Sequence, residues 1–127
     1  MRHSFLRVCV LASTLAAAAV PPASAHHGWS WAEEEFSELT GTVRAVFLGN
    51  PHARIEIEVE GEIWSVELAP PAATARAGFT EGAVSTGEEA TVVGHRSLDA
   101  NERVFKAVRV IVGDETYDVY PRRLPPA

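Results

Sequence analysis

The sequence predicts an all-β fold, a small barrel of five or six strands with one short helix in the middle of the chain. Apolar and polar residues alternate over several short stretches, which is the period of a half-buried strand. Turn residues, with glycine prominent among them, separate these stretches. The alternation gives way to an alanine-rich stretch behind two prolines, which is long enough for only a turn or two of helix.

The first three strands follow from unbroken alternation. Between Ala53 and Glu60 every second residue is apolar, and Glu60-Gly61-Glu62 turns the chain into a partner strand. An earlier period-2 stretch predicts the first strand, in which Gly41 is expected to make a bulge or bend. The residues that share one face of each predicted strand are Leu39, Gly41, Val43, Ala45 and Phe47 in the first, Ala53, Ile55, Ile57 and Val59 in the second, and Trp64, Val66 and Leu68 in the third.

The second half of the chain begins with the predicted helix, at residues 70–78, where prolines start it and Gly78 ends it. Two strands follow at residues 89–96 and 104–112. A turn at Gly113 leads into a last extended stretch at residues 116–120. The proline-rich end is expected to fray.

This order, three strands, a helix and two or three strands, predicts an OB-like Greek-key barrel with its helix between strands 3 and 4. An open sandwich is the alternative. The barrel is preferred because the strands are short and a bend at Gly41 suits a long, curled first strand. Closure also removes most exposed strand edges.

Residues 1–25 have the features of a secretory signal peptide. Arg2 and Arg7 precede an apolar run at residues 8–20, and Ala23-Ser24-Ala25 forms a small-residue cleavage signal. The run is shorter than the roughly 20 residues that a membrane span needs. The expected organisation is a signal peptide at 1–25, an N-terminal tail at 26–38, the barrel at 39–120 and a flexible C-terminal tail at 121–127.

Cysteine usage indicates the compartment. Cys9 is the only cysteine and lies in the leader, so the mature chain would have neither a disulfide nor a thiolate metal ligand. An exported domain that relies on its hydrophobic core alone is compatible with the bacterial periplasm, which is the predicted location.

Removal of the leader would leave nine basic and seventeen acidic residues, a formal net charge of −8. This balance repels phosphate backbones and anionic headgroups, so nucleic acid and membrane surfaces are not expected partners. The expected partners are a metal ion or a periplasmic protein or peptide, and the protein is expected to be a monomer without a membrane span.

Cleavage after Ala25 would make His26 the first residue of the mature protein, followed directly by His27. An N-terminal histidine offers two nitrogens, its amine and its imidazole, to one metal ion. Copper is the metal that such a group favours.

Two further histidines stand where an OB-type barrel places its binding face. His52 follows Asn50-Pro51 in the connection between strands 1 and 2, and His95 lies at the end of strand 4. If the tail folds back, His26 with His52 or His95 supplies three nitrogens suited to Cu(II). The predicted metal ligands are His26, His27, His52 and His95.

Each of these residues also has a structural interpretation. His52 sits in an ordinary turn sequence, and His95 can stack on the barrel rim. Trp29 and Trp31 are expected to anchor the tail against the barrel. The acidic residues Glu33, Glu34, Glu35, Glu38 and Glu67 are expected to face solvent.

No catalytic motif is present, neither a nucleophile elbow, nor a phosphate-binding loop, nor a dinucleotide fingerprint, so an enzyme is not predicted. The predicted function is metal buffering or delivery in the periplasm, with Cu(II) favoured. The alternative is a binding or interaction module that uses the same barrel loops without a metal. An oxygen-activating enzyme is the least favoured hypothesis, because 102 residues leave little room for a substrate platform.

Several short motifs together resemble an uncharacterised family of small exported bacterial proteins. They are His26-His27-Gly28-Trp29, Gly41-x-Val43, Asn50-Pro51-His52, Trp64-x-Val66-Glu67-Leu68, Arg76-x-Gly78 and Gly94-His95-Arg96. A looser resemblance is to the periplasmic copper chaperone of the Cus efflux system, which implies an OB-type barrel that handles copper. That chaperone uses methionine ligands, whereas Met1 is the only methionine here. The difference favours Cu(II) held by nitrogen.

Overall fold

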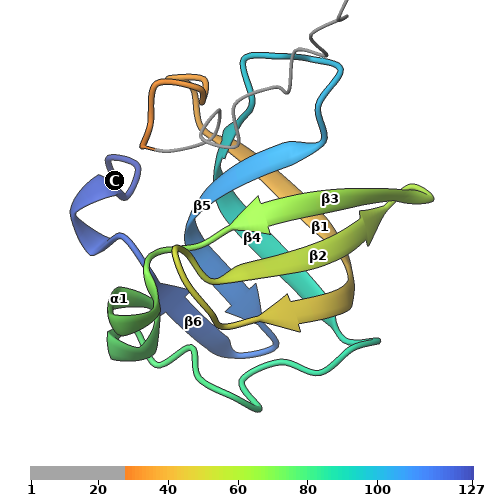
Figure 1. Ribbon diagram of the computed structural model, residues 1–127, viewed down its shortest axis with the longest axis vertical. Helices are drawn as coiled ribbons and strands as arrows, with labels where there is room; N and C mark the ends of the chain where they lie inside the picture. Colours follow the sequence, from red (N-terminus) through yellow and green to blue (C-terminus); the bar gives the residue numbers. More distant parts are fainter. Residues whose placement is uncertain (1–27) are drawn as a thin grey trace, which may run out of the picture.

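Six strands and one short helix follow one another in the predicted order (Figure 1). In this computed structural model residues 28–127 are described; the predicted signal peptide, His26 and His27 lie outside them. The elements are β1 (Ser37–Phe47), β2 (Arg54–Val59), β3 (Glu62–Glu67), α1 (Pro71–Arg76), β4 (Glu89–Arg96), β5 (Val104–Val112), β6 (Glu115–Asp118) and the 3-10 turn η1 (Pro121–Arg123).

The sheet closes on itself. Its strand order is β3-β2-β1-β4-β5-β6, and β3 also pairs with β5 in parallel, with Ser65 opposite Val104 and Glu67 opposite Lys106. Five strands therefore form a closed mixed barrel, and β6 extends the sheet beyond β5. The prediction of a small all-β barrel with one helix between strands 3 and 4 is confirmed.

The long strand β1 bends as it changes partner. Its first half pairs with β4 and its second half with β2, and Thr42 pairs with both. A Cβ at the preceding Gly41 would lie 2.4 Å from the carbonyl oxygen of Glu58, so the close approach of β2 requires glycine there. The register shift itself lies between Val43 and Ala45, just beyond the predicted position.

The core contains the inward positions that the alternation predicts in β2 and β3. Ile55, Ile57 and Val66 are fully buried, and Phe105 of β5 packs with them. Burial of a Val, Leu, Ile or Phe side chain contributes roughly 1.5–3 kcal/mol, so this face stabilises the barrel. The β2–β3 turn is made by Glu60 and Gly61, both with positive φ, as in a type I′ hairpin turn.

The helix α1 closes the end of the barrel beside the β1–β2 connection (Figure 1). Pro71 stands in its first turn, and its one buried residue, Thr74, donates a hydrogen bond from its hydroxyl to the carbonyl oxygen of Ala69. Gly78, with φ of +94°, turns the chain out of the helix.

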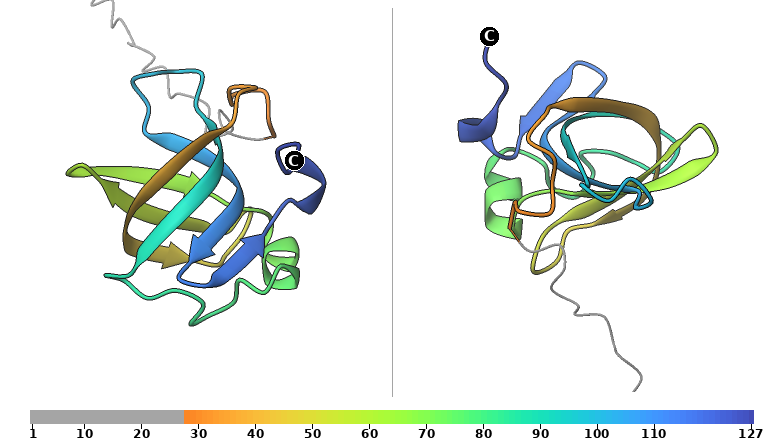
Figure 2. Two further views of the ribbon diagram at one scale, coloured as in Figure 1. Left: turned by 180° about the vertical axis from the view of Figure 1, so that it is seen from behind. Right: turned by 90° about the horizontal axis from the view of Figure 1, so that it is seen from above.

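The two ends of the described chain lie side by side outside the barrel (Figures 1 and 2). We call residues 28–36 the N-terminal segment. Trp31 is buried, Ala32 forms a β-bridge with Ser97, and the Glu33 amide donates a hydrogen bond to the carbonyl oxygen of Arg96. These contacts confirm that the region around the two tryptophans is anchored on the barrel. Within residues 28–127, no helix is long and apolar enough to cross a membrane.

Candidate functional site

A buried ion pair lies on the outer face of the barrel, beneath the chain ends. Lys106 is in β5 between Phe105 and Ala107, which both point into the core, so its side chain points outward. It is nevertheless only 1% exposed. Its ammonium group donates a hydrogen bond to the Glu67 carboxylate and lies 5.1 Å from the centre of the Trp29 ring and 5.5 Å from that of Tyr120.

The expectation that Glu67 faces solvent is wrong. Glu67 does lie on the outer face at the end of β3, as the alternation predicts, but its side chain is only 16% exposed and is paired with Lys106. The parallel β3–β5 pairing places Glu67 directly opposite Lys106. The Nδ1 atom of His52 lies 3.7 Å from the same carboxylate. One carboxylate therefore lies between the β1–β2 connection and the buried lysine.

Trp29 is the central ring of this region. Its ring meets those of Tyr120 and His95 edge-on, with centroid distances of 4.8 Å and 5.9 Å, and the Arg123 guanidinium lies 4.1 Å from its centre. Two cations, those of Lys106 and Arg123, are therefore within cation–π distance of one indole. The N-terminal segment and the C-terminal residues Tyr120 and Arg123 therefore pack together around the Trp29 ring.

The Tyr120 hydroxyl is affected by its surroundings. Burial, and to a smaller extent the negative charge of Glu67, raise its pKa to about 12 against the opposing effect of the positive charge of Arg123. The phenol is therefore neutral at physiological pH and does not compete with Glu67 for the Lys106 charge.

His95 is oriented by a backbone hydrogen bond. It is 8% exposed, its ring stacks at a tilt against Phe36 at 4.4 Å, and its Nδ1 atom lies 3.0 Å from the carbonyl oxygen of Glu35. A carbonyl oxygen only accepts, so Nδ1 carries the hydrogen, and in the neutral ring the lone pair is on Nε2. Metal-binding histidines are commonly oriented in this way.

A β-bulge places His95. The register between β4 and β5 shifts between Val93 and Gly94. A Cβ on Gly94 would lie 2.0 Å from the carbonyl oxygen of Lys106, so only glycine fits at this step. The bulge therefore links the backbone of Lys106 to the position of His95.

His95 lines a surface hollow of about 390 Å³ together with residues of both chain ends: Trp29, Ser30, Ala32, Glu33, Glu34 and Arg123. The lining combines an imidazole, two carboxylates and a guanidinium, so the hollow is polar. Glu33 is half-buried and Glu34 is exposed, in keeping with the predicted solvation of this acidic segment.

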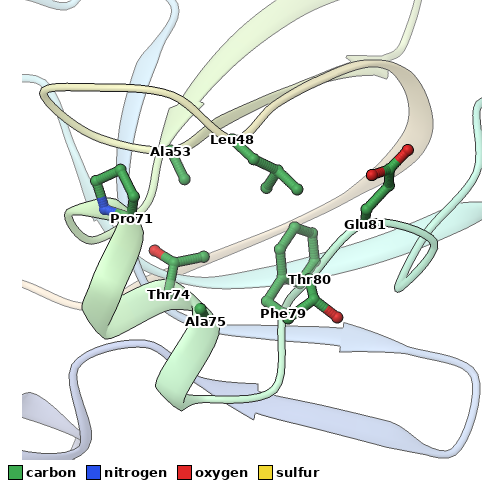
Figure 3. Close-up of a pocket in the computed structure, with 8 residues that line it drawn as sticks. All are labelled: Leu48, Ala53, Pro71, Thr74, Ala75, Phe79, Thr80 and Glu81. Carbon is green, nitrogen blue, oxygen red and sulfur yellow. The ribbon is translucent and has the colours of Figure 1, made fainter.

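A second hollow, of about 230 Å³, lies between α1 and the β1–β2 connection (Figure 3). Its lining is largely apolar and includes Leu48, Ala53, Ala75 and Phe79. The buried Thr74 hydroxyl in its wall already donates to the carbonyl oxygen of Ala69, and Glu81 is the one charged residue in the lining.

The structure places the predicted loop histidines around the same ion pair. His52 approaches Glu67, while His95 is the cross-strand neighbour of Lys106. In the part of the chain that the structure describes, no three His, Cys, Asp or Glu side chains gather to hold a metal ion. His52 and His95 therefore need a further ligand to form a metal site, and His26 and His27 lie outside the described residues.

Three residues of this region were not predicted from the sequence: Lys106, Tyr120 and Arg123. A signal for the first was present, because Lys106 is the only lysine in the chain and stands in a run of apolar residues. A charged residue inside such a strand indicates a buried partner. Tyr120 and Arg123 belong to the stretch around the end of the barrel, for which no packing was expected.

Comparison with known proteins gives a family but no activity. No curated protein matches the chain. Residues 12–105 match a family of unknown function, DUF6152, and this range contains β1 to β4 with the beginning of β5. The predicted resemblance to an uncharacterised family is confirmed, whereas the similarity to copper chaperones stays a prediction. The chain belongs to the family of unknown function DUF6152.

Proposed function

We propose that the protein binds Cu(II) in the periplasm and buffers or delivers it. Export and cleavage after Ala25 would make the amine and imidazole of His26 the first two ligands, with a loop imidazole as the third. His27 is the candidate to complete the site, whereas His52 lies beside Glu67. No catalytic step is part of this proposal.

The orientation of His95 is the observation that carries the proposal. The hydrogen bond from Nδ1 to the Glu35 carbonyl fixes the ring and keeps the lone pair of the neutral imidazole on Nε2. His95 also lines the polar hollow beside Trp29. We therefore assign the third nitrogen to His95 rather than to His52, whose ring lies on the far side of the Lys106–Glu67 pair.

The length of the chain allows the amino terminus to reach this imidazole. Only three peptide units join His26 to Trp29, and they span at most about 11 Å. Trp29 is itself in edge contact with the His95 ring. The carboxylates of Glu33 and Glu34 in the same hollow favour a cation over an anion.

Calorimetric titration with Cu(II) tests the proposal on three proteins: the chain that begins at His26, the same chain with one extra residue before His26, and the His95→Gln variant. Even the hydrogen-bond partners of metal ligands change metal affinity about 10- to 100-fold, so loss of a ligand should weaken binding at least that much. The His52→Gln variant is the matched control and should bind nearly as well as the wild type. Equal affinity of the processed and extended chains would refute the proposal.

A second candidate function is a binding module that needs no metal. The apolar hollow between α1 and the β1–β2 connection favours it, because the barrel loops form that hollow (Figure 3). Ala75 is exposed in its wall, so Ala75→Trp would fill the hollow with little effect on the core. A periplasmic peptide or protein that is captured with metal chelated, and lost on this substitution, would support this function. A partner lost on chelation would count against it.

A further inference from the structure

We infer that Lys106 is a positioning residue: its ammonium group, fixed by Glu67, holds Trp29 against the barrel and thereby keeps the N-terminal histidines beside His95. The metal-related part of this inference rests on the proposed function. The anchoring of the N-terminal segment does not depend on a metal.

The first step is the location of the charge. Lys106 lies on the outer face of β5, where a lysine ordinarily reaches solvent, yet the side chain is covered almost completely. Its cover consists of aromatic rings from the two chain ends, Trp29 and Tyr120. One ammonium group thus attracts two segments that are far apart in the sequence.

The second step is the role of Glu67. The carboxylate accepts a hydrogen bond from the Lys106 ammonium group, which fixes that group in front of the rings. An apolar residue at position 106 would fill the same space, but it would lack the electrostatic attraction to the faces of the rings. The pair therefore adds a directional contact to the packing.

Trp29 connects the ion pair to the proposed ligands. Trp29 contacts both the Lys106 ammonium group and the His95 ring. His27 precedes Trp29 by two residues, so the position of this indole limits where both N-terminal histidines can lie. The Arg123 guanidinium also lies against Trp29, but Arg123 is exposed, so water weakens this contact.

The experiment uses the chain that begins at His26 and removes both charges together, by Lys106→Met with Glu67→Gln, so that no unpaired charge stays buried. The matched control is Arg44→Met with Glu58→Gln, which removes an exposed ion pair between β1 and β2. Lys106→Arg, which keeps the positive charge, tests rescue. Trp29→Leu keeps the ion pair and removes the ring, and it replaces the double variant should that one fail to fold.

The first measurement is amide hydrogen exchange without metal. The amides of Glu33 and Leu98 bond the N-terminal segment to the barrel, and we expect their exchange to quicken about tenfold or more in the double variant and in Trp29→Leu. Amides of the β4–β5 ladder, such as Val92, should stay slow. Unchanged exchange at Glu33 and Leu98, or an equal increase over the whole barrel, would overturn the inference.

The second measurement is the electron paramagnetic resonance spectrum of bound Cu(II). We expect the spectrum of the double variant to resemble that of a free His-His-Gly peptide, and Lys106→Arg and the Arg44 control to keep the wild-type spectrum. A loosened segment with an unchanged copper spectrum would refute the positioning of the ligands. If the wild type bound no Cu(II), the proposed function would fail, and the exchange measurement alone would decide whether Lys106 holds the segment.

Discussion

The buried ion pair predicts an unequal response to the loss of its two partners. Glu67→Leu leaves the Lys106 ammonium group almost fully buried against two rings, without a carboxylate. Removal of one partner of a buried pair costs about 3–5 kcal/mol.

Lys106→Met should lower the free energy of unfolding by less than Glu67→Leu does. It leaves the Glu67 carboxylate, which is 16% exposed to water and has His52 at 3.7 Å as a second partner. We expect a loss of about 1–2 kcal/mol, below the range for a fully buried unpaired charge. The combination of Lys106→Met and Glu67→Leu leaves neither charge, and we expect it to cost less than Glu67→Leu alone.

Urea denaturation of the chain that begins at His26, followed by circular dichroism, measures these losses. In a domain of this size 1 kcal/mol corresponds to about 4–8 °C in Tm, so thermal unfolding gives a second measure. The exposed Arg44–Glu58 pair supplies the control, because Arg44→Met should cost about 1 kcal/mol or less. A loss of stability in Lys106→Met as large as that in Glu67→Leu, or a loss in the combined variant equal to the sum of the two, would refute the unequal response.

Three further predictions follow from single positions. Ultraviolet titration should show one of the two tyrosines, Tyr120, ionising near pH 12. Its pKa in the folded protein is raised above the unfolded value of about 10. The stabilisation that it contributes is therefore complete below pH 10 and should disappear by pH 12. Gly94→Ala should lower the free energy of unfolding in urea by about 3 kcal/mol, because its Cβ would meet the Lys106 carbonyl oxygen. The magnetic resonance signals of the His95 imidazole should also shift. Unchanged His95 signals would contradict the role of the bulge. Ile57→Val removes one fully buried methylene and should cost about 0.5–1.5 kcal/mol with unchanged Cu(II) affinity, which separates core stability from the site.

The barrel was predictable because short stretches of the sequence determine its strands and turns. Unbroken alternation from Ala53 to Glu60 fixes which side of β2 is buried, and a one-residue slip would turn every apolar side chain outward. The Glu60-Gly61 turn fixes the register with β3 in the same way. The order of elements then selects a closed barrel, because the β3–β5 pairing covers two strand edges.

The candidate site was predictable only in part. Alternation correctly places Glu67 on the outer face, but it cannot say what covers that face. The cover comes from Trp29 and Tyr120, one from each end of the described chain. Their positions depend on long-range pairing, which a local pattern does not contain. His95 could be identified from sequence as a strand-end histidine, whereas its bond to the Glu35 carbonyl depends on the fold of the N-terminal segment.

The same pairing removes an obstacle in the sequence-based copper hypothesis. That hypothesis required the tail to fold back along the whole of β1 to meet a loop histidine. In the structure the start of β1 lies beside the end of β4, with Ser37 opposite Gly94, so the N-terminal segment leaves the barrel next to His95 without folding back.

If the predicted leader is removed, the cleavage position decides which ligands the chain offers. Cleavage after Ala25 would give His26 a free amine, which would close a chelate ring with its own imidazole at most three peptide units from Trp29. Cleavage after Ala23 would leave the same four histidines and the same net charge but move the amine two residues away from His26. Intact mass and Cu(II) affinity measured on the same exported sample should therefore change together, and tight binding by the longer form would show that the imidazoles suffice without the amine.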